Sequence, residues 1–72
     1  MTEIGILSVV ALLEEHPESG LVRGQVGTVV EQWAPDVYEV EFSDDDGKTY
    51  AVVSLQASQL MRLLHEPAHR AA

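Results

Sequence analysis

Two glycines three residues apart, Gly24 and Gly27, constrain most strongly what this chain can fold into. The β-branched run Thr28–Val30 follows the second glycine directly. Such residues favour strands, whereas glycine in a strand marks a bulge or a place where another backbone approaches closely. The segment Arg23–Glu31 therefore predicts a chain that leaves a loop at Gly24 and enters a strongly bent strand, as in a small barrel.

Alternating apolar and polar residues predict the remaining strands. Val37–Phe42 alternates most regularly, because Tyr38, Val40 and Phe42 share one face. A short helix over Ile6–Glu15 is an alternative to the first strand, since Leu, Ala and Glu favour helices. The five predicted strands are Ser8–Leu12, Gln25–Gln32, Val37–Phe42, Thr49–Leu55 and Leu60–Leu64. In the second of them, Val26, Thr28 and Val30 are expected on one face, and Val29 with Glu31 on the other.

Turn residues separate these strands. Glu14–Gly24 reads as a long loop in which Leu21 and Val22 anchor the chain to the core. Trp33–Asp36 predicts a turn around Pro35, and Ser43–Lys48 predicts a hairpin turn through its Asp-Gly pair.

Gln56–Gln59 fits a single 3₁₀ turn. The prediction is an all-β fold, a small SH3-like barrel of about five strands with one 3₁₀ turn. We expect one domain over residues 1–64 and a flexible C-terminal tail over residues 65–72.

The charge of the chain limits its partners. Twelve acidic residues against 4 basic ones give a formal charge of -8, so no cluster of cations can displace counterions from phosphates. Nucleic acids and anionic membranes are therefore disfavoured, whereas a basic protein partner would be attracted. The chain has no cysteine, no basic segment at its start and no apolar run of about 18 residues, so we expect a cytoplasmic protein.

Three motifs resemble catalytic or ligand sites without meeting their requirements. His65–His69 reads His-Glu-x-x-His, but Pro67 interrupts the helix that a zinc protease needs. Asp44–Gly47 lacks the spacing of an EF-hand, and Gly24–Gly27 lacks the lysine and helix of a phosphate loop. No serine has a nucleophile signature around it. We therefore predict no enzyme activity and no catalytic, cofactor-binding or metal-binding residue.

Trp33, the single tryptophan, has two interpretations. It is either an anchor for a partner or a lid folded over the barrel end. The predicted partner-binding surface combines loop and turn residues, namely Glu15, His16, Trp33, Asp44, Asp45 and Asp46. Structural roles are predicted for Gly24, Gly27 and Gly47.

Several segments together resemble a family of short bacterial proteins known only as a domain of unknown function. The resemblance runs from Val9 to Leu64 and is carried by Val9–Leu13, Gly20-Leu21, Arg23–Glu31, Tyr38–Phe42 and the Asp-Gly turn before Thr49–Ala51. It implies an SH3-like barrel in a small stand-alone protein and no particular activity. Our own hypothesis is that some members act beside a partner protein, as antitoxins or immunity proteins do.

Two looser likenesses give alternatives. Arg23–Glu41 is similar to the KOW motif of ribosomal proteins and transcription factors, with Gly27 at its glycine. The barrel also resembles the SH3-like domain of nitrile hydratase β-subunits. The leading hypothesis is a non-catalytic protein-binding module. The alternatives are a KOW-like nucleic-acid or ribosome-associated module and an accessory subunit of a metalloenzyme.

Overall fold

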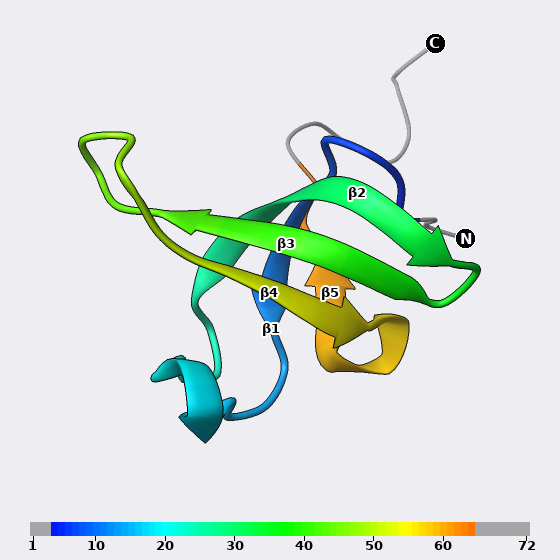
Figure 1. The fold of residues 1–72 in the computed structure, drawn as a ribbon, viewed down its shortest axis with the longest axis horizontal. Coiled ribbons are helices and arrows are strands. Elements are labelled where there is room, and N and C mark those ends of the chain that lie inside the picture. Colours follow the sequence, from blue (N-terminus) through cyan, green and yellow to red (C-terminus); the bar gives the residue numbers. More distant parts are fainter. Residues whose placement is uncertain (1–3, 65–72) are drawn as a thin grey trace, which may run out of the picture.

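The computed structural model describes residues 4–64, which form one antiparallel sheet of five strands (Figure 1). The strands are β1 (Val9–Leu12), β2 (Val26–Ala34), β3 (Val37–Ser43), β4 (Thr49–Gln56) and β5 (Leu60–Arg62). Their order in the sheet is β4-β3-β2-β1-β5, so β4 and β5 are the two edges. The predicted all-β class is confirmed. Two 3₁₀ helices are present where one was expected, η1 (Pro17–Ser19) and η2 (Ala57–Gln59), because Pro17 starts an additional turn inside the long loop.

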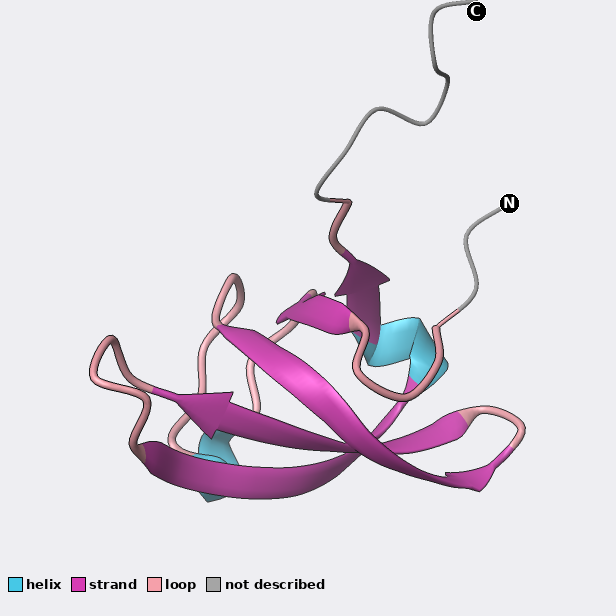
Figure 2. Cartoon of the chain, turned by 90° about the horizontal axis from the view of Figure 1, so that it is seen from above, coloured by secondary structure: helices cyan, strands magenta, loops and turns pink. Residues whose placement is uncertain are grey.

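Strand β1 lies between β2 and β5 in a strongly curved and twisted sheet (Figure 2). Val10 pairs with Gly27 of β2 on one side and with Arg62 of β5 on the other. Val10, Ala11 and Leu12 are all buried. The helical alternative for Ile6–Glu15 is therefore wrong, because hydrogen-bonding partners on both edges outweigh the weak helix propensity of this run.

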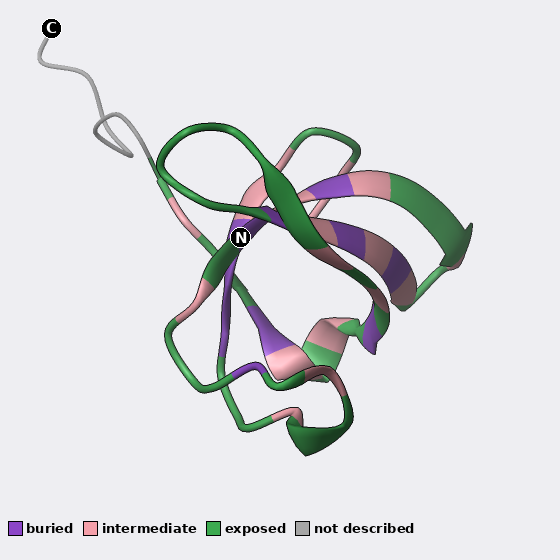
Figure 3. Ribbon diagram, turned by 60° about the vertical axis from the view of Figure 1, so that its left-hand side comes forward, coloured by how far each residue is buried: buried purple, intermediate pink, exposed green. Residues whose placement is uncertain are grey.

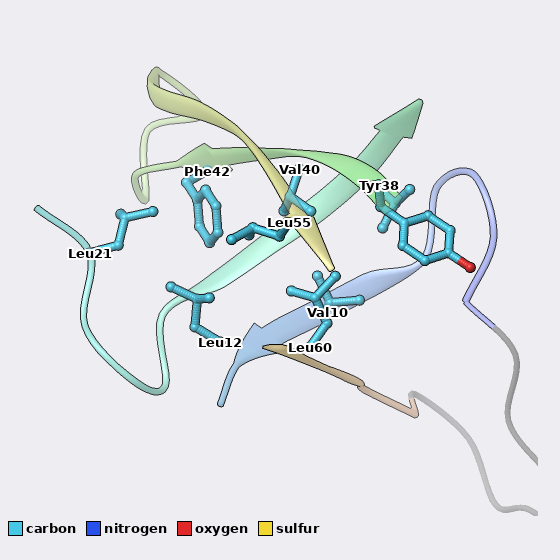
Figure 4. Packing of buried hydrophobic residues seen from close by; sticks show 9 residues of the cluster. Val10, Leu12, Leu21, Tyr38, Val40, Phe42, Leu55 and Leu60 are labelled. Atoms are coloured by element: carbon cyan, nitrogen blue, oxygen red, sulfur yellow. The ribbon is translucent and has the colours of Figure 1, made fainter. Parts of the chain in front are cut away.

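The core lies on the inner face of the bent sheet (Figure 4). Tyr38, Val40 and Phe42 all point into it, as the alternation along β3 predicts. The hydroxyl of Tyr38 lies 3.2 Å from the carbonyl oxygen of Ile4, so the first described residues close one end of the core. The buried cluster consists of Val10, Leu12, Leu21, Val29, Tyr38, Val40, Phe42, Leu55 and Leu60.

The chain enters β2 through a close contact at Gly27. A Cβ atom at this position would lie 2.7 Å from Val40 Cγ1 and 2.9 Å from the carbonyl oxygen of Glu41. Three residues earlier, Gly24 has a φ of 97° and donates its N–H to the carbonyl oxygen of Leu12 at 2.8 Å. The first glycine thus turns the chain, and the second lets β3 cross close to β2.

Strand β2 departs from regular alternation after Val29. Val29 pairs with Val40 in the core, whereas Glu31 pairs with Glu39, which lies between two inward-facing residues and points outward. The expectation that Val29 and Glu31 share a face is wrong, because the register shifts between them and a bulge inserts one extra residue. A second register shift lies between Gln32 and Ala34.

Of the two residues predicted to anchor the β1–β2 loop to the core, only one is buried. Leu21 is buried, but the side chain of Val22 is 50% exposed. The backbone of Leu21 makes two hydrogen bonds with that of His16, at 2.9 and 3.1 Å, and this pairing directs Leu21 inward. Its extended neighbour Val22 then points outward.

The remaining differences concern the ends of elements. Strand β2 continues to Ala34, so only Pro35 and Asp36 form the turn and Trp33 lies in a strand. Strand β5 ends at Arg62 rather than at Leu64. The predicted tail and its His-Glu-x-x-His pattern lie outside the described residues. Within residues 4–64, no helix is long and apolar enough to cross a membrane.

Candidate partner-binding face

Trp33 lies near the end of β2, on a broad exposed stretch of that strand (Figure 3). Its side chain is 59% exposed, so the interpretation of Trp33 as a lid over the barrel end is wrong. The indole Nε1 donates a hydrogen bond to Oε1 of Glu39 at 3.2 Å. This bond holds the ring on the outer face of the sheet, because Glu39 is an outward residue of β3. Trp33 is thus a large apolar surface fixed in place beside a carboxylate.

Three carboxylates share the outer face with Trp33. Glu39 and Glu41 alternate with the buried residues of β3, and the bulge in β2 brings Glu31 opposite Glu39. Like charges directly opposite each other across two strands destabilise a sheet. The outer surface formed by Glu31, Trp33, Glu39 and Glu41, here called the acidic–aromatic face, therefore concentrates negative charge at a cost in stability.

The predicted site residues lie in three separate parts of the fold. Trp33 lies at the end of β2, Glu15 and His16 lie in the loop before η1, and Asp44–Asp46 lie in the turn between β3 and β4 (Figure 1). Strand β3, with 7 residues, separates Trp33 from that turn. At about 3.3 Å per residue this separation is roughly 20 Å. One compact site therefore cannot include all six predicted residues.

The acidic turn between β3 and β4 owes its shape to Asp44. Its Oδ1 accepts hydrogen bonds from the backbone N–H groups of Asp46 and Lys48, both at 2.9 Å. The N–H of Gly47, whose φ is 81°, donates to the carbonyl oxygen of Asp44. Asp44 thus stabilises the turn, and all three aspartates of the turn are exposed.

Glu15 and His16 are also engaged in the loop. Oε2 of Glu15 accepts a hydrogen bond from the N–H of Arg23 at 3.2 Å, which closes the loop across η1. His16 bonds through its backbone to Leu21, and its ring Nδ1 is buried without a hydrogen-bond partner in the structure. Both residues therefore shape the loop. Among residues 4–64, no three His, Cys, Asp or Glu side chains are placed to hold a metal ion.

Sequence reasoning missed the three glutamates of the acidic–aromatic face as site residues. For Glu39 and Glu41 the signal was present, because the alternation along Val37–Phe42 places both on the side opposite the core. For Glu31 no local signal exists, since its orientation depends on a bulge that only the pairing with β3 reveals. Trp33 lies in the strand, not in the expected turn, because Ala34 pairs with Val37 and the second register shift, between Gln32 and Ala34, brackets it.

The family model of DUF4926, described as a domain of unknown function, matches residues 6–62. The chain belongs to this family. The match includes all five strands, and hence the whole acidic–aromatic face. Comparisons with curated proteins and with solved structures gave no match. The resemblance to a domain-of-unknown-function family is thereby confirmed. The description of DUF4926 names no activity.

Proposed function

We propose that this DUF4926 protein is a non-catalytic, SH3-like binding module of a bacterial protein and that its partner is a basic protein surface. The observation that carries the proposal is Trp33, which is 59% exposed and hydrogen-bonded to Glu39 on a face with two further glutamates. Tryptophan is enriched among the residues that dominate binding energy, and carboxylates around it complement Lys and Arg.

The like-charged pair Glu31–Glu39 supports this function. Direct opposition of two carboxylates weakens the sheet, and residues that break a local rule for stability are often found at functional sites. A cationic partner group placed between the two side chains would convert this repulsion into attraction. The pair is therefore suited to a complex more than to the isolated chain.

One form of this function is an antitoxin or immunity protein. Carboxylates on a rigid sheet mimic the phosphates of a nucleic acid, and a surface that binds phosphates would accept them. The formal charge of -8 would speed the encounter with such a surface. The acidic–aromatic face would then cover the basic site of the partner and block its access.

The test is co-purification with the product of the neighbouring gene. We expect the wild-type chain to retain that protein, and Trp33→Ala to weaken the complex about thirtyfold, as for a residue at the centre of an interface. The double variant Glu39→Gln/Glu41→Gln is expected to weaken it at least about tenfold.

The matched control is Glu14→Gln/Glu18→Gln, which removes the same charge from the exposed loop around η1. This control should keep the affinity of the wild type. Equal losses in the two double variants would show that net charge alone drives the association. Recovery of the wild-type chain alone at every salt concentration would overturn the proposed function.

A further inference from the structure

The two edges of the sheet differ sharply. Strand β5 has three residues, ends in the cation Arg62 and offers little length for another strand. Strand β4 has eight residues, Thr49–Gln56, without a charge, a proline or a glycine, and it pairs only with β3. Proteins usually protect a long edge with charges, proline or a covering segment, because unpaired backbone groups attract other strands. Strand β4 lacks the charges and the proline.

The open part of this edge has defined limits. At one end, the N–H of Ala57 donates to the carbonyl oxygen of Asp36, and the N–H of Gln56 donates to Oε1 of Gln59. These two N–H groups are therefore not available to an added strand. Because hydrogen-bonding directions alternate along an antiparallel strand, Val52 and Ser54 turn their N–H and C=O groups away from β3. The register shift opposite Phe42 limits this edge at its other end. Val52 and Ser54 are both exposed.

The surroundings of the edge select the chemistry of an added strand. On the outer face, Glu41 pairs with Val52 and Glu39 pairs with Ser54, so two carboxylates lie one strand away from the edge. On the inner face, Ala51 and Val53 are half-buried at the margin of the core. A strand beside β4 would therefore meet negative charge on one face and apolar surface on the other.

We propose that β4 receives an extended segment of the basic partner, which runs antiparallel to β4 and adds a sixth strand. The segment alternates Lys or Arg, directed to Glu39 and Glu41, with apolar residues that cover Ala51 and Val53. Main-chain hydrogen bonds to Val52 and Ser54 supply the register. This inference rests on the proposed function, because it describes how the partner of the acidic–aromatic face is held.

The test uses a synthetic ten-residue peptide of alternating Lys and Val with blocked ends. In the proposed geometry the Lys residues lie opposite Val52 and Ser54, so their N–H groups face β4 and those of Val face solvent. N-methylation at the Lys residues should weaken binding about tenfold, and N-methylation at the Val residues should leave it unchanged. The two peptides have the same composition and charge.

A second readout comes from the protein. Binding of the unmodified peptide should slow the hydrogen exchange of the Val52 and Ser54 amides, measured by NMR. Ser54→Pro removes an outward N–H and should weaken binding about tenfold, whereas Ser54→Ala keeps the N–H and should not. Because the peptide series leaves the protein unaltered, it remains decisive if Ser54→Pro fails to fold.

Three results would overturn the edge inference. In the first, both methylated peptides bind as the unmodified one does, and Glu39→Gln/Glu41→Gln abolishes binding. The glutamates would then bind the basic peptide without an added strand. If the unmodified peptide does not bind, the edge is not a site for such a segment, and the Trp33 variants still test the proposed function separately. If the amides of Val52 and Ser54 are protected without peptide in a dimer seen by sedimentation, the edge belongs to a second copy.

Discussion

The inner and outer faces of β3 are built from neighbouring residues but follow opposite rules. Inward, Tyr38, Val40 and Phe42 are buried in an apolar core. Outward, Glu39 accepts a hydrogen bond from an exposed tryptophan and faces a like charge across the sheet, and Glu41 lies on the same face. The inner face buries apolar side chains, whereas on the outer face two carboxylates, those of Glu31 and Glu39, repel each other. The comparison shows that apolar burial is concentrated on the inner face, whereas the outer face carries the charged residues.

Gly27→Ala is expected to have the largest effect, because it brings a new atom into the tightest part of the inner face. The added Cβ would meet Val40 Cγ1 at 2.7 Å and the carbonyl oxygen of Glu41 at 2.9 Å. A backbone oxygen cannot move aside as a side chain can, so we expect a loss of about 3 kcal/mol in the free energy of unfolding. Urea denaturation followed by circular dichroism would measure it.

Gly5→Ala is the matched control for this substitution, because a Cβ on Gly5 would meet no atom within 4 Å. The control should change the free energy of unfolding by less than about 0.5 kcal/mol. Equal effects of the two substitutions would mean that the close approach of β2 and β3 at Gly27 does not limit the fold.

Val40→Ala and Val52→Ala compare the two faces directly with one chemical change. Val40 is fully buried on the inner face, whereas Val52 is 50% exposed on the outer face. Loss of the two methyl groups should cost about 2 kcal/mol at Val40 and less than about 0.5 kcal/mol at Val52. The same denaturation experiment measures both. A cost at Val52 as large as that at Val40 would contradict the division of roles between the faces.

The inner face was largely predictable from the sequence, and the acidic–aromatic face only in part. A period of two along Val37–Phe42 fixes which residues enter the core, and the Asp-Gly pair at Asp46 marks the hairpin turn. The position of Glu31 depends on the bulge after Val29, which bends β2 so that it can pair with both β1 and β3. No local residue pattern encodes that bulge, because its cost is offset by distant pairing.

The exposure of Trp33 could not be predicted from the sequence either, because it also depends on pairing between strands. Proline at position 35 correctly indicates a turn, but the strand before it extends further than the local residues require. Pairing of Ala34 with Val37 extends the ladder, and the second register shift leaves Trp33 beside Glu39 on the outer face. Tertiary pairing thus decides whether this tryptophan covers the core or is exposed on the outer face.

Glu31→Gln is expected to have the smallest effect. It measures how much the repulsion between Glu31 and Glu39 destabilises the chain in the absence of a partner. Removing one charge of the Glu31–Glu39 pair should raise the free energy of unfolding by about 0.5 kcal/mol at low salt. Because ions screen repulsion between exposed charges, the gain should shrink at about 1 M NaCl. Glu18→Gln, a change of equal charge in an exposed loop, is the control and should give a smaller gain. If Glu31→Gln instead lowers stability at low salt, the pair is not repulsive in the free chain, and the argument that it is suited to a cationic partner fails.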